Sequence, residues 1–224
     1  MIKRVILLTL VVIMSVFSIV SCNQVKNREY DEKEVLAAAK ALIEKSEILN
    51  ELYYGKGIAY TDDMSLANGI YYPADEISVE KFGIETVEDI IALTRECFTV
   101  SLSNIIIGTK LQVVMDSSGN QSYVRYYQKY DTLDTTKPEC IMVNKEAEVL
   151  LKDKVTYDYQ TLSVKGAEGE VVKVTIAVTV ENDAGEVQYK TLEIGLLEEA
   201  DGWRIDTPTY TRYIDDSYYQ ELQK

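Results

Sequence analysis

The chain has 224 residues, of which 37 are acidic and 23 are basic, and it contains no histidine. The acidic excess disfavours binding to nucleic acid or to anionic lipid headgroups, because both need a basic surface. The missing histidine excludes Ser-His-Asp and Cys-His catalysis and every metal site that depends on imidazole ligands. With 46% apolar residues and no Pro/Gly-rich break, the chain can bury one core, and we expect one domain.

The N-terminus has the layout of an export signal. Lys3 and Arg4 precede an apolar run over residues 5–20, which is shorter than the roughly 20 residues that a membrane-spanning helix prefers. The run ends at Ile19-Val20-Ser21-Cys22, which resembles the lipobox of bacterial lipoproteins. The resemblance implies cleavage before Cys22, a thioether-linked lipid on its side chain and acylation of its amine where the organism does so.

The predicted export signal divides the chain into segments. We expect a lipoprotein signal peptide over residues 1–21, a polar tether over 22–30, one α+β domain over 31–210 and a C-terminal tail over 211–224. The mature protein is then expected at the extracytoplasmic face of the cell membrane, anchored by lipid at Cys22. Because no polybasic stretch adjoins this cysteine, the anchor would hold through hydrophobic contact alone.

Cys97 and Cys140 are the remaining cysteines, and outside the cytoplasmic membrane a disulfide between them is chemically permitted. Their spacing does not decide whether they pair. Cys97 falls among the apolar positions of an expected helix, which favours a small buried hydrophobic side chain over a disulfide.

A first helix is expected from Asp31. This residue is a typical N-cap, Glu34 stands three residues later as a capping-box partner, and Gly55 and Gly57 end the helical pattern. Apolar residues recur at helical spacing along one side, namely Val35, Leu36, Ala39, Leu42, Ile43, Leu49, Leu52 and Tyr53.

The segment over residues 58–85 is too long for a simple link between helices. Segments of this length are usually functional or contain small elements of their own. This one is rich in aromatic and acidic side chains, which suit an interface with a partner. The expected contact residues are Tyr60, Asp62, Asp63, Tyr71, Tyr72, Asp75 and Glu76.

A second helix is expected from Thr86, where Thr86-Val87-Glu88-Asp89 has the form of a helix start, to Gly108. The β-branched residues Thr99 and Val100 and the serines at 101 and 103 weaken its middle, so the helix can be interrupted at Thr99. Its apolar stripe comprises Val87, Ile90, Ile91, Cys97, Phe98, Leu102, Ile105 and Ile106.

Strand patterns follow the second helix. Residues 111–115 and 122–130 flank a turn at 116–119, and residues 140–143 form a short apolar run. Residues 145–151 fit either a strand or a helical turn.

Residues 155–210 show the clearest sheet pattern. Apolar residues at every second position over 172–180 are typical of a strand with one buried face. A turn over 182–185 leads to a second strand, and Gly202 permits a tight turn into a third. The apolar residues of the three strands are Val172, Val174, Ile176, Val178, Val180, Leu192, Ile194, Leu196, Trp203 and Ile205.

Helices followed by hairpin-linked strands predict an α+β domain, in which N-terminal helices pack on one face of a curved antiparallel sheet. This order is similar to the NTF2-like (cystatin-like) group of folds, which implies a cone-shaped sheet. The resemblance is carried by the helix starts at Asp31 and Thr86, the long strands that end at Leu196 and the closing Gly-Trp-Arg-Ile-Asp over 202–206.

More narrowly, several short stretches resemble the exported IseA-type inhibitors of cell-wall DL-endopeptidases. These stretches are Tyr71-Tyr72, residues 86–89, Cys97-Phe98-Thr99 and Trp203-Arg204-Ile205. The resemblance implies a non-catalytic protein with an acidic surface that enters the cleft of a partner enzyme, and it assigns no individual inhibitory residue.

No catalytic, cofactor or metal motif stands out in the sequence. There is no Gly-rich phosphate loop and no Asp-x-Asp-x-Asp-Gly calcium loop, and the doublets Asp62-Asp63 and Asp215-Asp216 are of a kind more often solvated than coordinating. A carboxylate pair could still perform acid/base chemistry, but 37 acidic residues make any chosen pair weak evidence. We therefore predict a non-catalytic protein without a cofactor or metal ion.

Tyrosine is unusually frequent, with 17 tyrosines against 3 phenylalanines and 1 tryptophan. Its flat apolar ring and polar tip suit wet interfaces and sugar contacts. The tyrosines gather around the end of the first helix, in residues 58–85 and again in residues 123–130. Strands also favour tyrosine as a core residue, so core packing is the alternative to a binding role for these tyrosines.

Taken together, these features favour a surface-tethered lipoprotein that binds or inhibits a cell-envelope protein or glycan. The alternative is an NTF2-like pocket protein that binds a small ligand or acts as an acid/base enzyme. A cavity between sheet and helix lined by paired carboxylates or tyrosines would favour the alternative. A space filled by Leu, Ile and Val would favour the binding protein.

The lipobox resemblance predicts the result of one substitution. Cys22→Ala should leave an unlipidated precursor, because the thiol that receives the lipid is gone. Metabolic labelling with a lipid precursor tests this expectation, and equal labelling of the variant and the parent protein would contradict it.

Overall fold

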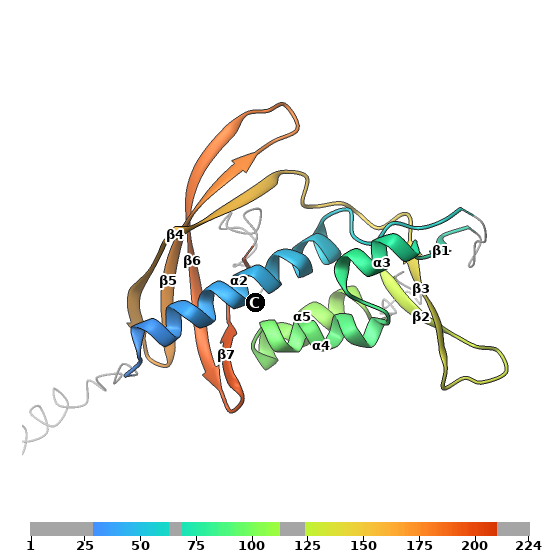
Figure 1. The fold of residues 1–224 in the computed structure, drawn as a ribbon, viewed down its shortest axis with the longest axis horizontal. Coiled ribbons are helices and arrows are strands. Elements are labelled where there is room, and N and C mark those ends of the chain that lie inside the picture. The colour runs from blue at the N-terminus through green and yellow to red at the C-terminus, as the bar shows by residue number, and fades with distance from the viewer. Residues whose placement is uncertain (1–28, 63–68, 113–123, 210–224) are drawn as a thin grey trace, which may run out of the picture.

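The computed structural model describes residues 29–62, 69–112 and 124–209, and its elements confirm the α+β class (Figure 1). The helices are α2 (Glu32–Tyr54), α3 (Glu76–Phe82), α4 (Val87–Cys97) and α5 (Val100–Lys110), and the strands are β1 (Tyr71–Pro73), β2 (Tyr126–Tyr130), β3 (Pro138–Asn144), β4 (Lys154–Glu168), β5 (Val171–Glu181), β6 (Val187–Glu199) and β7 (Gly202–Ile205).

Some sequence predictions concern residues outside the described ranges. They are the signal peptide with Cys22, the contact residue Asp63, the turn at 116–119 and the C-terminal tail. These stay predictions. Of the strand expected just before that turn, Leu111 is described, and it caps the end of α5.

The long helix α2 begins where the sequence predicts. The Asp31 carboxylate accepts hydrogen bonds from the backbone N–H groups of Lys33 and Glu34, at 2.8 and 3.4 Å. The carboxylate of Glu34 does not complete a capping box, because it accepts the indole N–H of Trp203 at 3.1 Å. Gly55 caps the other end of the helix, as expected.

The second predicted helix is interrupted at Thr99, its predicted weak point, and so forms two helices. Thr86 and Asp89 form the expected capping box of α4, and Thr99 is the N-cap of α5. The break occurs because the chain extends there toward the edge of β7, where the Thr99 N–H donates to the carbonyl of Ile205 at 3.0 Å. The predicted end at Gly108 is wrong, since α5 continues to Lys110.

A four-stranded antiparallel sheet with the order β4-β5-β6-β7 confirms the pattern of the C-terminal strands. Val172 lies opposite Leu196 and Val174 opposite Ile194, so both strands turn apolar side chains to the same face. Figure 1 shows α2 crossing this sheet, with α4 lying beside α2 and near β7. The expected cover by upstream helices is thus confirmed.

The other strands form a second sheet with the order β1-β3-β2, so the expectation of one curved sheet is wrong. Residues 145–153, between β3 and β4, are not a strand, because they dock on the end of α2. There the backbone N–H groups of Leu150 and Leu151 both donate to the carbonyl of Tyr54, at 2.7 and 2.6 Å. The β4–β7 sheet is open, and the cone of the NTF2-like group is not confirmed.

One core connects the two sheets. Tyr126, Ile141 and Val143 from the small sheet belong to the same buried cluster as Val172 and its neighbours in the large sheet. Between α2 and the large sheet, the space is filled by aliphatic side chains that are almost fully buried. They include Val35, Ala39, Ile43, Val174, Ile176, Leu192, Ile194 and Leu196.

Tyr126 at the start of β2 and Arg125 just before it join the small sheet to the end of α2. The Tyr126 hydroxyl donates to the carbonyl of Leu52 at 2.9 Å and accepts the N–H of Ile58 at 3.1 Å. The guanidinium of Arg125 donates to the carbonyl of Gly55. A Cβ on Gly57, whose φ is +70°, would lie 2.0 Å from the Tyr126 hydroxyl, so only glycine fits this approach.

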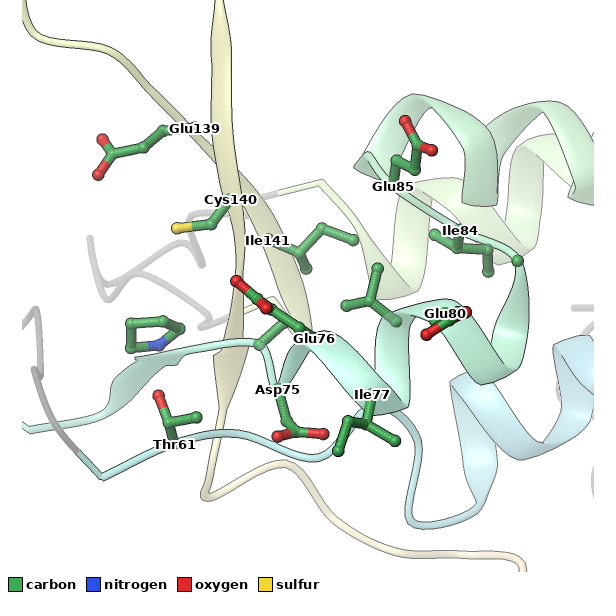
Figure 2. A pocket seen from close by; sticks show the side chains of 14 residues that line it. Thr61, Asp75, Glu76, Ile77, Glu80, Ile84, Glu85, Glu139, Cys140 and Ile141 are labelled. Atoms are coloured by element: carbon green, nitrogen blue, oxygen red, sulfur yellow. The ribbon is translucent and has the colours of Figure 1, made fainter.

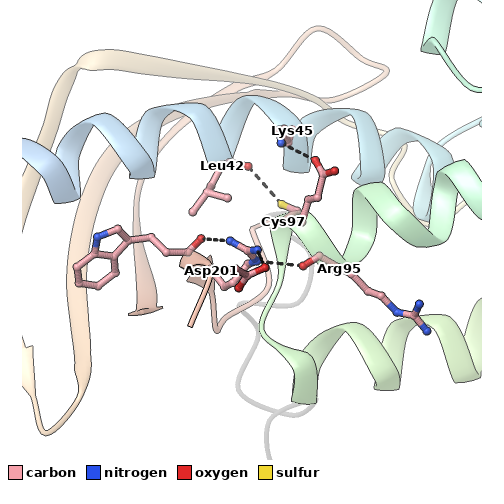
Figure 3. Close-up of polar contacts among 8 residues, drawn as sticks. Leu42, Lys45, Arg95, Cys97 and Asp201 are labelled. Atoms are coloured by element: carbon pink, nitrogen blue, oxygen red, sulfur yellow. Dashed lines mark hydrogen bonds and ion pairs between the residues drawn. The ribbon is translucent and has the colours of Figure 1, made fainter. Parts of the chain in front are cut away.

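Arg204 links the last strand, β7, to α4 (Figure 3). Arg204 on β7 donates to the carbonyls of Arg95 and Trp203, at 3.1 and 2.9 Å, and pairs with Asp201 at 2.6 Å. Cys97 is buried nearby and donates to the carbonyl of Leu42 at 3.4 Å.

Neither Cys97 nor Cys140 forms a disulfide. Burial raises the pKa of the Cys97 thiol to about 12, so the side chain stays neutral. The interpretation of Cys97 as a small buried hydrophobic residue is confirmed.

Replacement of Trp203 tests its place in the core. Trp203→Ala should lower the free energy of unfolding by about 3–5 kcal/mol, the range for loss of a buried aromatic side chain. Leu133→Ala is the control, because Leu133 is exposed and a surface change should stay within about 0.5 kcal/mol. Urea denaturation measures both, and a loss under about 1 kcal/mol for Trp203→Ala would contradict the packing.

Candidate functional site

The segment over residues 58–85 folds back against β3. The Ala74 N–H donates to the carbonyl of Ile141, and the Asp75 N–H donates to the carbonyl of Ala59, both at 2.9 Å. The segment contains β1 and α3, which confirms that so long a connection has elements of its own.

Helix α3 is short and is positioned mainly by hydrogen bonds. The Asp75 carboxylate caps it by accepting the N–H of Ser78 at 2.9 Å, and Gly83 ends it with a left-handed φ of +65°. The Ser78 hydroxyl accepts the N–H of Ala59 at 2.9 Å. None of its residues is fully buried, although Val79 and Phe82 pack against the core, so α3 also contributes to the surface.

Between α3 and β3 lies a groove of about 820 Å³, called here the acidic groove (Figure 2). Glu80 and Glu85 stand on one side of it and Glu139 stands on the other, with Asp75 and Glu76 between them. No lysine or arginine is among the described residues that line it. The apolar part of the lining comes from Pro73, Ala74, Ile77, Val79, Ile84, Cys140 and Ile141.

The groove combines negative charge with accessible apolar surface. Ile77, in the first turn of α3, is 77% exposed, which is unusual for a side chain of this size. Ile84 and Ile141 are buried behind it. A ligand that carries both cationic and apolar groups would complement the two properties.

Of the five carboxylates that line the groove, only one is neutralised by an ion pair with a described residue. Glu139 pairs with Lys129 at 2.6 Å, and this hydrogen bond raises the pKa of Lys129. Asp75, Glu76, Glu80 and Glu85 form no ion pair with any described residue. Their uncompensated charge makes the groove a region of negative potential.

Two of the predicted contact tyrosines lie side by side near the groove. The ring centroids of Tyr60 and Tyr72 are 5.2 Å apart, and the ammonium of Lys145 lies 5.0 Å from the centroid of Tyr72. Tyr60 is 40% exposed. This pair is therefore accessible to a partner.

The prediction that Tyr71 contacts a partner is wrong. Its side chain is 5% exposed, its hydroxyl donates to the carbonyl of Val124 at 2.7 Å, and its ring packs edge-on against Tyr127. The reason is the alternation of side chains along β1, which places Tyr71 and Tyr72 on opposite faces of the small sheet.

Only some of the carboxylates predicted to contact a partner lie in the acidic groove. Asp75 and Glu76 line the groove, whereas the exposed Asp62 does not. Asp63 is outside the described residues.

Three carboxylates of the groove, Glu80, Glu85 and Glu139, were not predicted from the sequence. A signal for Glu80 exists, because Asp75 as N-cap and Gly83 as C-cap predict a helix that brings Glu76 and Glu80 to one side. Glu139 arrives from a distant strand, and no local pattern indicates it.

Within the described ranges, no group of three or more Cys, Asp and Glu side chains is arranged to hold a metal ion. None of the described helices is both long and apolar enough to cross a membrane. Comparisons with protein families, curated proteins and solved structures found no match. The lipoprotein, NTF2-like and IseA-type resemblances therefore stay predictions.

The different positions of Tyr71 and Tyr60 lead to different expected stabilities. Tyr71→Ala should lower the free energy of unfolding by about 3–5 kcal/mol, since it removes a buried ring. Tyr60→Ala should cost under about 1.5 kcal/mol, the upper value of an aromatic pair interaction. Equal losses for the two variants in chemical denaturation would mean that the assignment of core and surface tyrosines is wrong.

Proposed function

We propose that this protein is a non-catalytic lipoprotein, tethered through Cys22 at the extracytoplasmic face of the cell membrane, that binds a cell-envelope protein. The acidic groove would receive a cationic segment of that partner. The observation that carries the proposal is the set of four groove carboxylates without an ion pair among the described residues, beside the exposed Ile77. Charges of this kind steer association with a complementary partner, and an accessible aliphatic side chain adds contact area.

A protein segment suits the groove better than a neutral glycan does. Lysine and arginine side chains carry both a cationic head and an apolar stem, which match the carboxylates and the apolar lining. The volume of about 820 Å³ is sufficient for a few side chains of an extended segment. The accessible pair Tyr60 and Tyr72 extends the contact surface beyond the groove.

The packing beneath α2 supports a binding protein over the pocket alternative. An NTF2-like ligand or enzyme site would occupy the space between helix and sheet, where Ile43, Ile176 and Ile194 are fully buried. Aliphatic side chains there offer no acid or base and leave little room for a ligand.

The concave shape of the acidic groove indicates which kind of surface the partner would contribute. The IseA-type resemblance implies an acidic surface that enters an enzyme's cleft, whereas the described carboxylates line a concave groove. We therefore expect the partner to contribute a protruding segment. Where that segment belongs to an enzyme, its capture would inhibit the enzyme by occlusion.

Neutralising the groove tests the proposal. The triple variant Glu76→Gln, Glu80→Gln and Glu85→Gln should slow association with the partner recovered from native envelope by roughly tenfold at low salt, because steering charges act mainly on the association rate. Its rate should also depend less on ionic strength. Surface-immobilised kinetics at two salt concentrations measure both effects.

The matched control removes the same charge elsewhere. Glu170→Gln, Glu181→Gln and Asp183→Asn change exposed carboxylates of the β4–β5 and β5–β6 turns. This control should associate at nearly the parent rate. If both triple variants slow association equally, net charge and not the groove directs binding, and recovery of a glycan without cationic groups as the sole partner would also overturn the proposal.

A further inference from the structure

A second hollow, of about 340 Å³, has the opposite charge to the acidic groove. It is called here the basic pocket, and its polar lining consists of Lys56, Tyr60, Arg125, Asn144 and Lys145. None of the described residues that line it is a carboxylate, although the chain has 37 acidic residues against 23 basic ones. The protein is strongly acidic, so the presence of three cationic side chains, Lys56, Arg125 and Lys145, at one pocket needs a physical explanation.

Arg125 is the central group of the basic pocket. Its side chain is 7% exposed and donates to the carbonyls of Gly55 and Glu148 and to the Tyr126 hydroxyl. A guanidinium has five N–H groups, so two remain without an acceptor in the described parts of the chain. Buried charges are normally paired with an opposite charge, yet no described carboxylate pairs with Arg125.

Two acidic residues that contact the lining of the pocket do not supply the missing counter-charge. Glu148 is exposed and offers Arg125 its backbone carbonyl. The Glu51 carboxylate accepts the backbone N–H of Lys56 at 3.1 Å and lines a different hollow. Among the described residues, the buried guanidinium therefore meets carbonyl and hydroxyl dipoles but no carboxylate within ion-pair distance.

The two lysines add to the positive charge. Lys145 lies 3.3 Å from the hydroxyl of Tyr72, and neither it nor Lys56 forms an ion pair within the ranges that the structure describes. Capping the end of α2 explains why an arginine is present at position 125. It explains neither the two N–H groups left over nor the two lysines beside them.

We propose that the basic pocket binds an oxyanion, either a carboxylate or a phosphate group. The planar fork of Arg125 matches the paired oxygens of both groups, and the mobile ammonium groups of Lys56 and Lys145 supply further donors. The exposed ring of Tyr60 offers apolar contact to the rest of the ligand. This proposal does not depend on the partner assigned to the acidic groove.

The experiment uses the full chain in an uncharged detergent and isothermal titration calorimetry with two probes. Inorganic phosphate represents phosphate sources, and acetyl-alanine represents terminal carboxylates. Lys56→Gln with Lys145→Gln should weaken saturable binding about tenfold or more, because each charged donor contributes a strong hydrogen bond. Both lysines are exposed, so the variant should fold, whereas Arg125 also holds the end of α2 and is left unchanged.

The control variant, Lys137→Gln with Lys190→Gln, removes the same charge from exposed positions outside the pocket. It should bind within about twofold of the parent protein, since hydrogen bonds to the pocket are intact. Saturable binding of one probe alone supports the proposal and identifies the oxyanion. No saturable binding of either probe, or equal weakening in both variants, overturns it.

Discussion

The end of α2 is the constraint on which the rest of the structure depends. The last turn of a helix has carbonyl groups without partners in the helix, and α2 has no basic residue in its last turn to bind them. Tyr126 of β2 and Arg125 just before that strand satisfy two of these carbonyls, and Tyr54 accepts two N–H groups from the connection to β4. The small sheet and the large sheet are therefore fixed to the same helix end.

The hydroxyl of Tyr126 is fully used at this joint. It donates once, to Leu52, and accepts twice, from Ile58 and Arg125, which is the full capacity of a hydroxyl group. A buried and saturated polar network of this kind specifies one arrangement, because any shift leaves a polar group without a partner. The segment that begins at Ile58 starts from this fixed point.

That segment separates two regions of opposite charge. Ala59 and Thr61 hydrogen-bond to the chain around β1, with Thr61 at the acidic groove and Ala59 at the basic pocket. Both sites thus border the small sheet, and the acidic groove also borders α3, while the large sheet and α2 form the support. A ligand or partner with separated positive and negative groups would meet matching charges on the two sides.

Local patterns in the sequence predict local structure well. Asp31, Thr86 and Gly55 cap helices as expected, because a cap depends on residues within one turn. Apolar alternation predicts the large sheet, because its period follows from the backbone.

Contacts between distant residues were not predictable in this way. Glu139 joins Glu80 across the groove only because β3 packs beside α3, and Tyr71 is buried because Val124 and Tyr127 lie against it. The division into two sheets depends equally on a distant contact, since Leu150 and Leu151 bind the end of α2. Such contacts leave no period in the sequence.

The central claim is that a partner protein occupies the acidic groove, and site-specific photo-crosslinking in living cells tests it most directly. A photoreactive amino acid replaces Ile77 in the groove or, as the reference, the exposed Tyr189 on β6. The account predicts a defined covalent adduct with an envelope protein from position 77 and none from position 189. Adducts from position 189 with none from position 77 would contradict it.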